Sequence, residues 1–464
     1  MPDPRGAPYP VMTTFDVLLR GGQVVDTDGI RHLDLALRNG KITARLTPNE
    51  PAEAAHIVRV GGRFLLPGLV DAHVHLREPG MTWKEDFASG TQAAIAGGVT
   101  TVLVMPTDEP WTVSAADFKA KRALAEGRIF CDVGLQVAVG RDRSELAELA
   151  NLGATSFEIF TSDVPPDFLH ASTADLQAAV EAVRAAGGMV AISPGDQSVL
   201  DAELARLTAG RSTAADFVRS RPGHAEAQGI ARAILAAATA GAPVHIRQSN
   251  SRQGMAAYRR LRDLADVSIE TSPQCLMFTA SDYERLGPAA KASPPWRDAA
   301  DREAVRAAVA DGVIDIIVTD HAPHLMAEKL AQAEDFAAVP GGFPGVQTLL
   351  ATLLMLVDDG LIGLSDLVRL AASRPAERFG LGSHKGRLQV GFDADVLVLD
   401  PDRPTVIRGS DQLSKAGYTP FEGLSTSFSL ERVFLRGQEV PMHKMSGKTG
   451  FAGMAQGLVV MAER

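Results

Sequence analysis

The sequence has few cysteines, no long apolar run and no excess of positive charge, and each absence argues against a class of protein. The two cysteines, Cys131 and Cys275, lie far apart in the chain. They are expected to be buried thiols rather than a disulfide, as in a reducing cytoplasm. No apolar stretch approaches the length of a membrane span, and no secretory signal is visible. The net charge of −10 disfavours nucleic acid. We therefore expect a cytoplasmic protein that binds neither nucleic acid nor a membrane.

The middle of the chain alternates short apolar runs with longer alanine-rich segments such as 174–186 and 225–240. Short apolar runs between helical segments are typical of parallel strands with helical crossovers. Eight of them predict an α/β fold of the (β/α)8 barrel type, with functional side chains at the carboxyl ends of the strands. The expected strands are Leu65–Val70, Thr100–Met105, Cys131–Val139, Ser156–Phe160, Met189–Ile192, Val244–Ile246, Val267–Thr271 and Ile314–Val318.

Strand and turn patterns also occur near both ends of the chain. Gly21-Gly22 and Asn39-Gly40 each follow a strand-like run and are read as hairpin turns. Similar runs return at 394–400 and 432–437. We therefore predict a small composite β-sandwich domain from residues 14–66 and 381–440, a barrel from 67–380, and a C-terminal tail from 441–464.

The pair His73 and His75 stands at the end of the first expected barrel strand. Strand side chains alternate with period two, so both imidazoles point to the same side. Two imidazoles placed in this way begin a divalent metal site. A histidine pair can also be purely structural, but the polar segment that follows, residues 75–80, is unusual for an ordinary strand end.

Further motifs continue from this pair almost to the end of the chain. They are Lys84-Glu85-Asp86-Phe87, Gly97-Gly98-Val99-Thr100-Thr101, Met105-Pro106, Glu270-Thr271-Ser272-Pro273, and residues 291–298, 319–324, 385–387, 391–395 and 414–417. Together they resemble the amidohydrolase superfamily, in its dihydroorotase, allantoinase and hydantoinase branch. The resemblance implies a metal-dependent hydrolase of a cyclic amide, ureide or imide. It also implies a homo-oligomer, either a dimer or a tetramer.

The same resemblance implies a set of metal ligands, of which this chain keeps only part. His73, His75 and Asp320 match, whereas Glu158 stands where relatives carry a carboxylated lysine. Ser193 and Gln248 replace two ligand histidines, and neither side chain is a good divalent-metal ligand. We therefore expect one divalent metal per chain, held by His73, His75, Glu158 and Asp320, with zinc favoured over manganese or iron. Three alternatives remain: a Glu158 paired with a nearby arginine, an empty site, or two metals on altered ligands.

Asp320 is the expected catalytic residue, because a carboxylate beside the metal can take a proton from water and pass it to the leaving nitrogen. Arg77 and His324 match residues that bind substrate in dihydroorotases, and a guanidinium suits an anionic group. The alternative role of Arg77 is a salt bridge to a neighbouring glutamate. The expected substrate-binding residues are Arg77, Thr107, Gln248, Ser293, His324 and Gly342. The predicted partner is therefore a small cyclic amide, either neutral or anionic.

Two other functions are compatible with the altered ligand set. One is a non-catalytic dihydroorotase-like subunit that supports a partner enzyme such as a transcarbamoylase. The missing ligands favour it, whereas the retained Asp320, Arg77 and His324 oppose it. The other is a different reaction on a single metal, as in deaminases.

Overall fold

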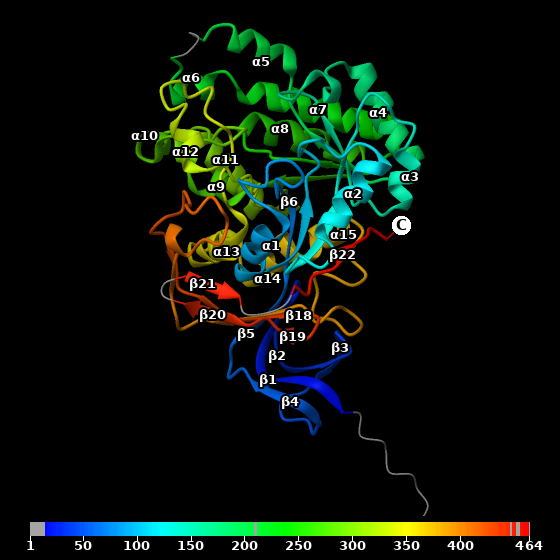
Figure 1. The fold of residues 1–464 in the computed structure, drawn as a ribbon, viewed down its shortest axis with the longest axis vertical. Helices are drawn as coiled ribbons and strands as arrows, with labels where there is room; N and C mark the ends of the chain where they lie inside the picture. Colours follow the sequence, from blue (N-terminus) through cyan, green and yellow to red (C-terminus); the bar gives the residue numbers. More distant parts are fainter. Residues whose placement is uncertain (1–13, 208–210, 446–447, 452–454, 464) are drawn as a thin grey trace, which may run out of the picture.

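The computed structural model describes residues 14–207, 211–445, 448–451 and 455–463. Figure 1 shows a small sheet at one end of the long axis and a larger body of strands and helices above it. The small sheet contains the first strands of the chain, drawn in blue, together with segments drawn in orange and red from the other end.

The larger body is the expected barrel. Its strands run parallel in two connected arcs, one ordered β6–β7–β8 and the other β9 to β14, and a bridge between Val74 and His321 joins their ends. The fold class predicted from the sequence is therefore confirmed. The barrel strands are β6 (Leu69–Val74), β7 (Val99–Val104), β8 (Asp132–Leu135) continued by β9 (Val137–Ala138), β10 (Phe157–Phe160), β11 (Val190–Ser193), β12 (Val244–Ile246), β13 (Val267–Thr271) and β14 (Ile316–Ile317).

Helices follow the strands and cover the outside of the barrel (Figure 1). In α4, Ser172 caps the first turn by accepting a hydrogen bond from the Asp175 amide, and the buried side chains recur at helical spacing. The helices are α1 (Phe87–Ala96), α2 (Ala115–Ala125), α3 (Leu146–Asn151), α4 (Thr173–Ala185), α5 (Gln197–Leu204), α6 (Ala214–Arg219), α7 (Gly223–Ala240), α8 (Arg252–Leu261), α9 (Pro273–Met277), α10 (Asp282–Leu286), α11 (Ala299–Ala310), α12 (Met326–Leu330), α13 (Leu349–Asp358), α14 (Leu364–Val368) and α15 (Arg374–Arg378).

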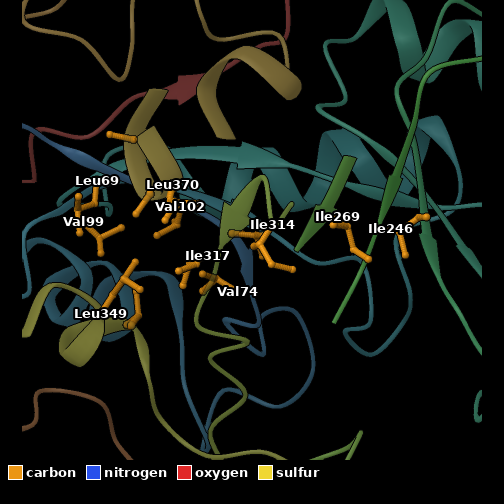
Figure 2. Close-up of a cluster of buried hydrophobic side chains, with 14 of the residues drawn as sticks. Leu69, Val74, Val99, Val102, Ile246, Ile269, Ile314, Ile317, Leu349 and Leu370 are labelled. Atoms are coloured by element: carbon orange, nitrogen blue, oxygen red, sulfur yellow. The ribbon is translucent and has the colours of Figure 1, made fainter. Parts of the chain in front are cut away.

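The largest buried core lies between the barrel strands and these helices. Figure 2 shows part of it, where Leu69, Val99 and Val102 of the strands lie near Leu349 and Leu370. All five side chains are fully buried. Truncating such a leucine to alanine costs about 2–5 kcal/mol of stability. The core therefore fixes the strand ends from which the functional side chains project.

The small sheet draws on both ends of the chain, in the order β19–β18–β15–β5–β1–β2–β3, with β4 paired to β1. The expected turn at Asn39-Gly40 joins β2 to β3, and both residues have positive φ. The hairpin expected at Gly21-Gly22 is wrong, because β1 continues through it with a register shift against β2. The strands of this sheet are β1 (Phe15–Asp26), β2 (Gly29–Arg38), β3 (Lys41–Leu46), β4 (Ala54–Arg59), β5 (Phe64–Pro67), β15 (Val396–Asp400), β18 (Ser429–Leu435) and β19 (Gln438–Glu439).

The first expected barrel strand, Leu65–Val70, is in fact two strands in two sheets. β5 pairs with β1 and β15 in the small sheet, and β6 begins only at Leu69. Both strands are apolar and buried, so the sequence shows no change of polarity at the crossing. Gly68 marks it, because a Cβ there would lie 2.0 Å from Thr100 Oγ1.

Part of the expected C-terminal tail returns to the barrel. β22 (Val459–Val460) pairs in parallel with β8, and the Leu458 amide donates to Asp132. Two short pairs complete the described strands: β16 (Thr405–Val406) with β17 (Ser425–Thr426), and β20 (Met442–Met445) with β21 (Lys448–Phe451). Residues 446–447, 452–454 and 464 of the expected tail lie outside the described residues. Within the described ranges, none of the helices combines the length and apolarity that crossing a membrane requires.

Candidate functional site

A cavity of about 290 Å³ opens at the carboxyl ends of the barrel strands, where the sites of this fold are found. Its lining includes residues of β6 and of the loop after β12. Further lining residues come from the 293–342 segment, which contains β14 and the loop that follows it. Thr107 and Glu158 are not among its lining residues. The predicted site residues that line it are His73, His75, Arg77, Gln248, Ser293, Asp320, His324 and Gly342.

His73, His75 and Asp320 form a group whose potential ligand atoms lie within 4.8 Å of one another. The Nε2 atoms of the two histidines lie 3.3 and 3.5 Å from Asp320 Oδ1. Their Nδ1 atoms face other partners: Glu270 Oε1 at 2.7 Å from His73, and Thr107 Oγ1 at 2.8 Å from His75. A partner on Nδ1 orients each ring and directs Nε2 toward a metal. Two imidazoles and one carboxylate are donors that fit a divalent metal.

The charges around this group are strongly perturbed. Burial raises the pKa of Asp320 to about 6, against the opposing influence of His73. Burial disfavours the charged form of His73, but Asp320 and Glu270 outweigh it and raise the pKa of His73. Burial and nearby Arg77 lower the pKa of His75 well below its usual value. Burial also disfavours ionised Glu270, but Arg247 and His73 outweigh it and hold its pKa well below the usual range. His75 is therefore neutral and available as a ligand at neutral pH.

Glu158 lies fully buried on β10, but its carboxylate does not join the group of potential ligands. Oε1 accepts from Ser156 Oγ at 2.7 Å and from Arg247 Nη2 at 2.5 Å, and Oε2 accepts from Arg247 Nε at 3.2 Å. This arrangement is the pairing with a nearby arginine that the sequence left open as an alternative. The role of Glu158 as a metal ligand stays a prediction, and the arrangement of its carboxylate does not support it.

Arg77 and His324 lie together on one wall of the cavity. Arg77 Nε donates to Pro323 O at 3.2 Å, and Nη2 lies 3.1 Å from His324 Nε2. Glu78, one of the alternative partners of Arg77, pairs with Arg128 at 2.8 Å instead. Burial, together with Arg77 and Lys84, lowers the pKa of His324 to about 2. The wall therefore presents the guanidinium of Arg77 beside a neutral imidazole, whose Nδ1 lies 3.1 Å from Lys84 Nζ.

The remaining predicted substrate residues have different surroundings. Gln248 Nε2 donates to Asp320 Oδ2 at 2.7 Å, and Ser293 Oγ donates to Asp163 Oδ2 at 3.3 Å. Thr107 contacts His75, so its visible role is to orient that ring. At Gly342, φ is +121° and a Cβ would lie 2.5 Å from Ala322 O, so only glycine fits this approach of the backbone to the cavity.

Four non-glycine residues that line the cavity have a left-handed backbone. They are Arg77, Asp163, Gln248 and Asp320, with φ of 58°, 59°, 46° and 52°. This conformation is uncommon outside glycine and costs free energy that the surrounding structure must offset. Its concentration at one cavity is typical of a functional site.

Several polar residues at or beneath the cavity were given no role from sequence. Arg221 lines the cavity and pairs with Asp163 at 2.9 Å, and Arg247 and Glu270 lie fully buried below it. Glu270 belongs to a motif used above, but its spacing in the chain gave no sign that it meets His73. Only the closing of the barrel brings these residues together.

Comparison with known proteins identifies the family. The amidohydrolase family model matches residues 64–440. The chain belongs to the amidohydrolase family. The amidohydrolase is 36% identical to an allantoinase of Solibacter usitatus over 92% of this chain and 94% of that protein. It is 31% identical to a dihydroorotase of Methanosarcina mazei over 97% and 99% of the two chains.

A solved structure gives the same result. The L-hydantoinase of Arthrobacter aurescens superposes on the amidohydrolase with a TM-score of 0.91 at 28% identity, covering 96% of this chain and all of that one. The expected membership of the dihydroorotase, allantoinase and hydantoinase branch is therefore confirmed, and with it the class of metal-dependent hydrolases of cyclic amides.

Proposed function

We propose that this amidohydrolase opens a cyclic amide, ureide or imide with one divalent metal held by His73, His75 and Asp320. The observation that carries the proposal is the convergence of these three side chains in a cavity at the strand ends. Two nitrogen donors and one carboxylate favour zinc, with manganese or iron as further candidates. The relatives named above support the class of substrate.

A metal bound there supplies a Lewis acid that polarises the carbonyl and acidifies water. Asp320 acts as the proton carrier: it accepts a proton from the attacking water and delivers it to the leaving nitrogen. Without a metal, burial raises the pKa of Asp320 to about 6, and a bound cation would favour the ionised form that accepts the proton. Gln248 holds Oδ2 of this carboxylate, while Oδ1 faces the two histidines.

Arg77 and His324 select the substrate. The buried guanidinium of Arg77 is already bound to Pro323 O and to His324, which fixes its direction beside the cavity. An anionic substituent on the ring would gain a charge-assisted hydrogen bond there. The nearby turn at Gly342 brings the backbone close to the cavity without a side chain in the way. The proposed substrate is thus a small cyclic amide, with a carboxylate-bearing ring preferred. A cytoplasmic location and a dimer or tetramer remain part of the proposal.

The test is a panel of hydantoins, dihydropyrimidines, cyclic imides and lactams, each with and without a carboxylate, assayed on zinc-loaded protein. We expect ring opening that stops when the metal is removed and returns when it is restored. His75→Asn should abolish it, whereas His384→Asn, a change in a histidine outside the cavity, should not. Arg77→Gln should remove the preference for carboxylate-bearing rings. If no ring opens and a partner transcarbamoylase requires this chain, the non-catalytic function replaces the proposed one.

A further inference from the structure

Arg247, in the loop directly after β12, is a cation enclosed in the barrel. The residue is fully buried, and each of its N–H groups has an acceptor. Nε and Nη2 donate to Glu158, Nη1 donates to Ala72 O and Glu270 Oε2 at 3.0 Å, and Nη2 also donates to Gln136 Oε1 at 2.5 Å. A buried charge is tolerated only when it is paired and fully hydrogen-bonded, and this guanidinium meets both conditions.

Two carboxylates share this one guanidinium. Glu158 directs both its oxygens to Arg247, with Ser156 as its other partner, so this carboxylate acts as a counter-charge. Glu270 directs one oxygen to Arg247 and His245 and the other to His73 Nδ1. A chain of contacts therefore runs from Glu158 through Arg247 and Glu270 to His73.

We propose that Arg247 is a positioning residue for the metal site: it holds Glu270, which in turn fixes the ring of His73, and it engages Glu158 so that this carboxylate is not a ligand. The inference rests on the proposed metal site of His73, His75 and Asp320. It explains why residue 158 is a glutamate in this chain, which the pattern of metal ligands alone does not explain. The acid at position 158 neutralises an arginine of the same barrel.

Three features support this reading over a purely structural salt bridge. The two oxygens of Glu270 face different partners: Oε1 faces His73 at 2.7 Å, and Oε2 faces His245 at 2.8 Å and Arg247 at 3.0 Å. Losing Arg247 therefore removes one of the two contacts that orient the carboxylate opposite His73. The guanidinium also lies over the ring of Phe379, 5.0 Å from its centroid, which limits its freedom to move. Arg247 is always charged, so any other cation near Glu158 or Glu270 would have to compete with it for the oxygens of these two carboxylates.

The test measures Co²⁺ binding and its visible absorption spectrum on the full-length metal-free protein. The variants are Arg247→Met, Arg247→Lys and Glu158→Gln, with Arg436→Met as a matched control. Arg436 also pairs with a buried aspartate, Asp132, but in the junction with the small sheet. Thermal unfolding of each metal-free variant separates lost stability from lost positioning.

We expect Arg247→Met to weaken Co²⁺ binding about 10- to 100-fold, as is usual when the partner of a ligating histidine is disturbed. Its absorption bands should shift, because the orientation of His73 changes. Arg247→Lys should fall between Arg247→Met and the wild type, and it decides the matter if Arg247→Met does not fold. Glu158→Gln keeps an oxygen for the guanidinium, so it should still bind one equivalent with the wild-type spectrum. Arg436→Met should unfold earlier but bind Co²⁺ unchanged.

The outcomes separate this inference from the function on which it rests. If the wild type binds one Co²⁺ and folded Arg247→Met and Arg247→Lys bind it with the same affinity and spectrum, Arg247 has no positioning role. If Glu158→Gln loses the metal, Glu158 is a ligand and the inference is wrong, while the metal site stands. If the wild type binds no Co²⁺, the proposed metal site itself fails and the inference fails with it.

Discussion

Two clusters among the described residues each bring three potential metal-ligating side chains close together, and they differ in what already fills them. His73, His75 and Asp320 form one, and Asp132, Asp393 and Asp395 form the other. In the second cluster, Lys385 Nζ lies 2.5, 2.9 and 2.7 Å from the three carboxylates. In the first, the described part of the chain shows only the two histidines as ion-pair partners of Asp320.

The positions of the clusters match this difference. The carboxylate cluster joins Asp132 at the start of β8 to Asp395, which precedes β15 of the small sheet, so it ties barrel and sheet together. The histidine cluster lies at the other ends of the strands and faces the cavity. A group of acidic side chains is therefore not enough to indicate a metal. What matters is whether the chain has already neutralised their charge.

The largest expected effect is on the reaction itself. Asp320→Asn keeps the shape of the side chain but removes its basic oxygen, and kcat should fall by about two to four orders of magnitude. The matched change in the other cluster, Asp393→Asn, should leave kcat unchanged. The measurement is the rate of ring opening for the best substrate of the panel, at a temperature where both variants are folded. Full activity in Asp320→Asn would remove it from the mechanism.

The next effect is on stability. Lys385→Met leaves buried carboxylates without their main cation, which typically costs about 3–5 kcal/mol. Urea denaturation should show this loss, while the folded variant still binds one equivalent of metal. His75→Asn should show the reverse, with lost metal and little change in the stability of the metal-free protein. A Lys385→Met variant as stable as the wild type would mean that the second cluster does not hold the two parts together.

The third effect concerns pH and belongs to the histidine cluster alone. Asp320 has a pKa of about 6 and that of His73 is raised, so both carry protons in acid and must lose them to bind a metal. Metal affinity should therefore rise between pH 5 and pH 7, by up to about tenfold per pH unit for each proton released. Competition titrations with a chelator of known affinity measure it. An affinity that does not change over this range would contradict the assigned ligands.

The smallest effect contrasts two buried lysines. Lys385 is surrounded by carboxylates, whereas Lys329 donates to the carbonyls of Pro288 and Lys291, and burial lowers its pKa to about 7. Its folded pKa lies below the unfolded value, so the unfolded chain binds more protons above pH 7 and the wild type gains stability as the pH rises. Relative to the wild type, Lys329→Met should lose about 2–3 kcal/mol of stability between pH 6 and pH 9, because each of the roughly two pH units above the folded pKa contributes about 1.4 kcal/mol.

Denaturation of both proteins at the two pH values checks this sign. Lys119→Met, a change in an exposed lysine paired with Glu148, serves as the control and should show no such trend. A difference between Lys329→Met and the wild type that stays constant with pH would show that Lys329 is equally charged in both states.

The fold could be predicted from local patterns because barrel strands and their helices are short, regular and separated by turns. The error at residues 65–70 has a physical cause: β5 and β6 are both apolar, and strand pairing rather than composition decides which sheet each joins. The return of β22 to β8 was likewise invisible, since it depends on the pairing of Val459 with Val133, which lie far apart in the chain.

The site could be predicted in part for a similar reason. His73, His75 and Asp320 stand at strand ends, where the period of a strand and the direction of a parallel barrel already place side chains together. The partner of Glu158 could not be identified, because Arg247 is 89 residues away and reaches it only across the closed barrel. Sequence therefore identified the candidate ligands that a pattern brings together, and missed the internal cation that only packing reveals.

Metal content tests the central claim most directly. Protein purified without chelator and then saturated with zinc should contain one equivalent per chain by elemental analysis, and His75→Asn should contain almost none. Asp393→Asn should retain the full equivalent. One ion bound among His73, His75 and Asp320 in an anomalous-scattering map would complete the agreement. Two equivalents, none, or an ion at Asp132, Asp393 and Asp395 would contradict the account.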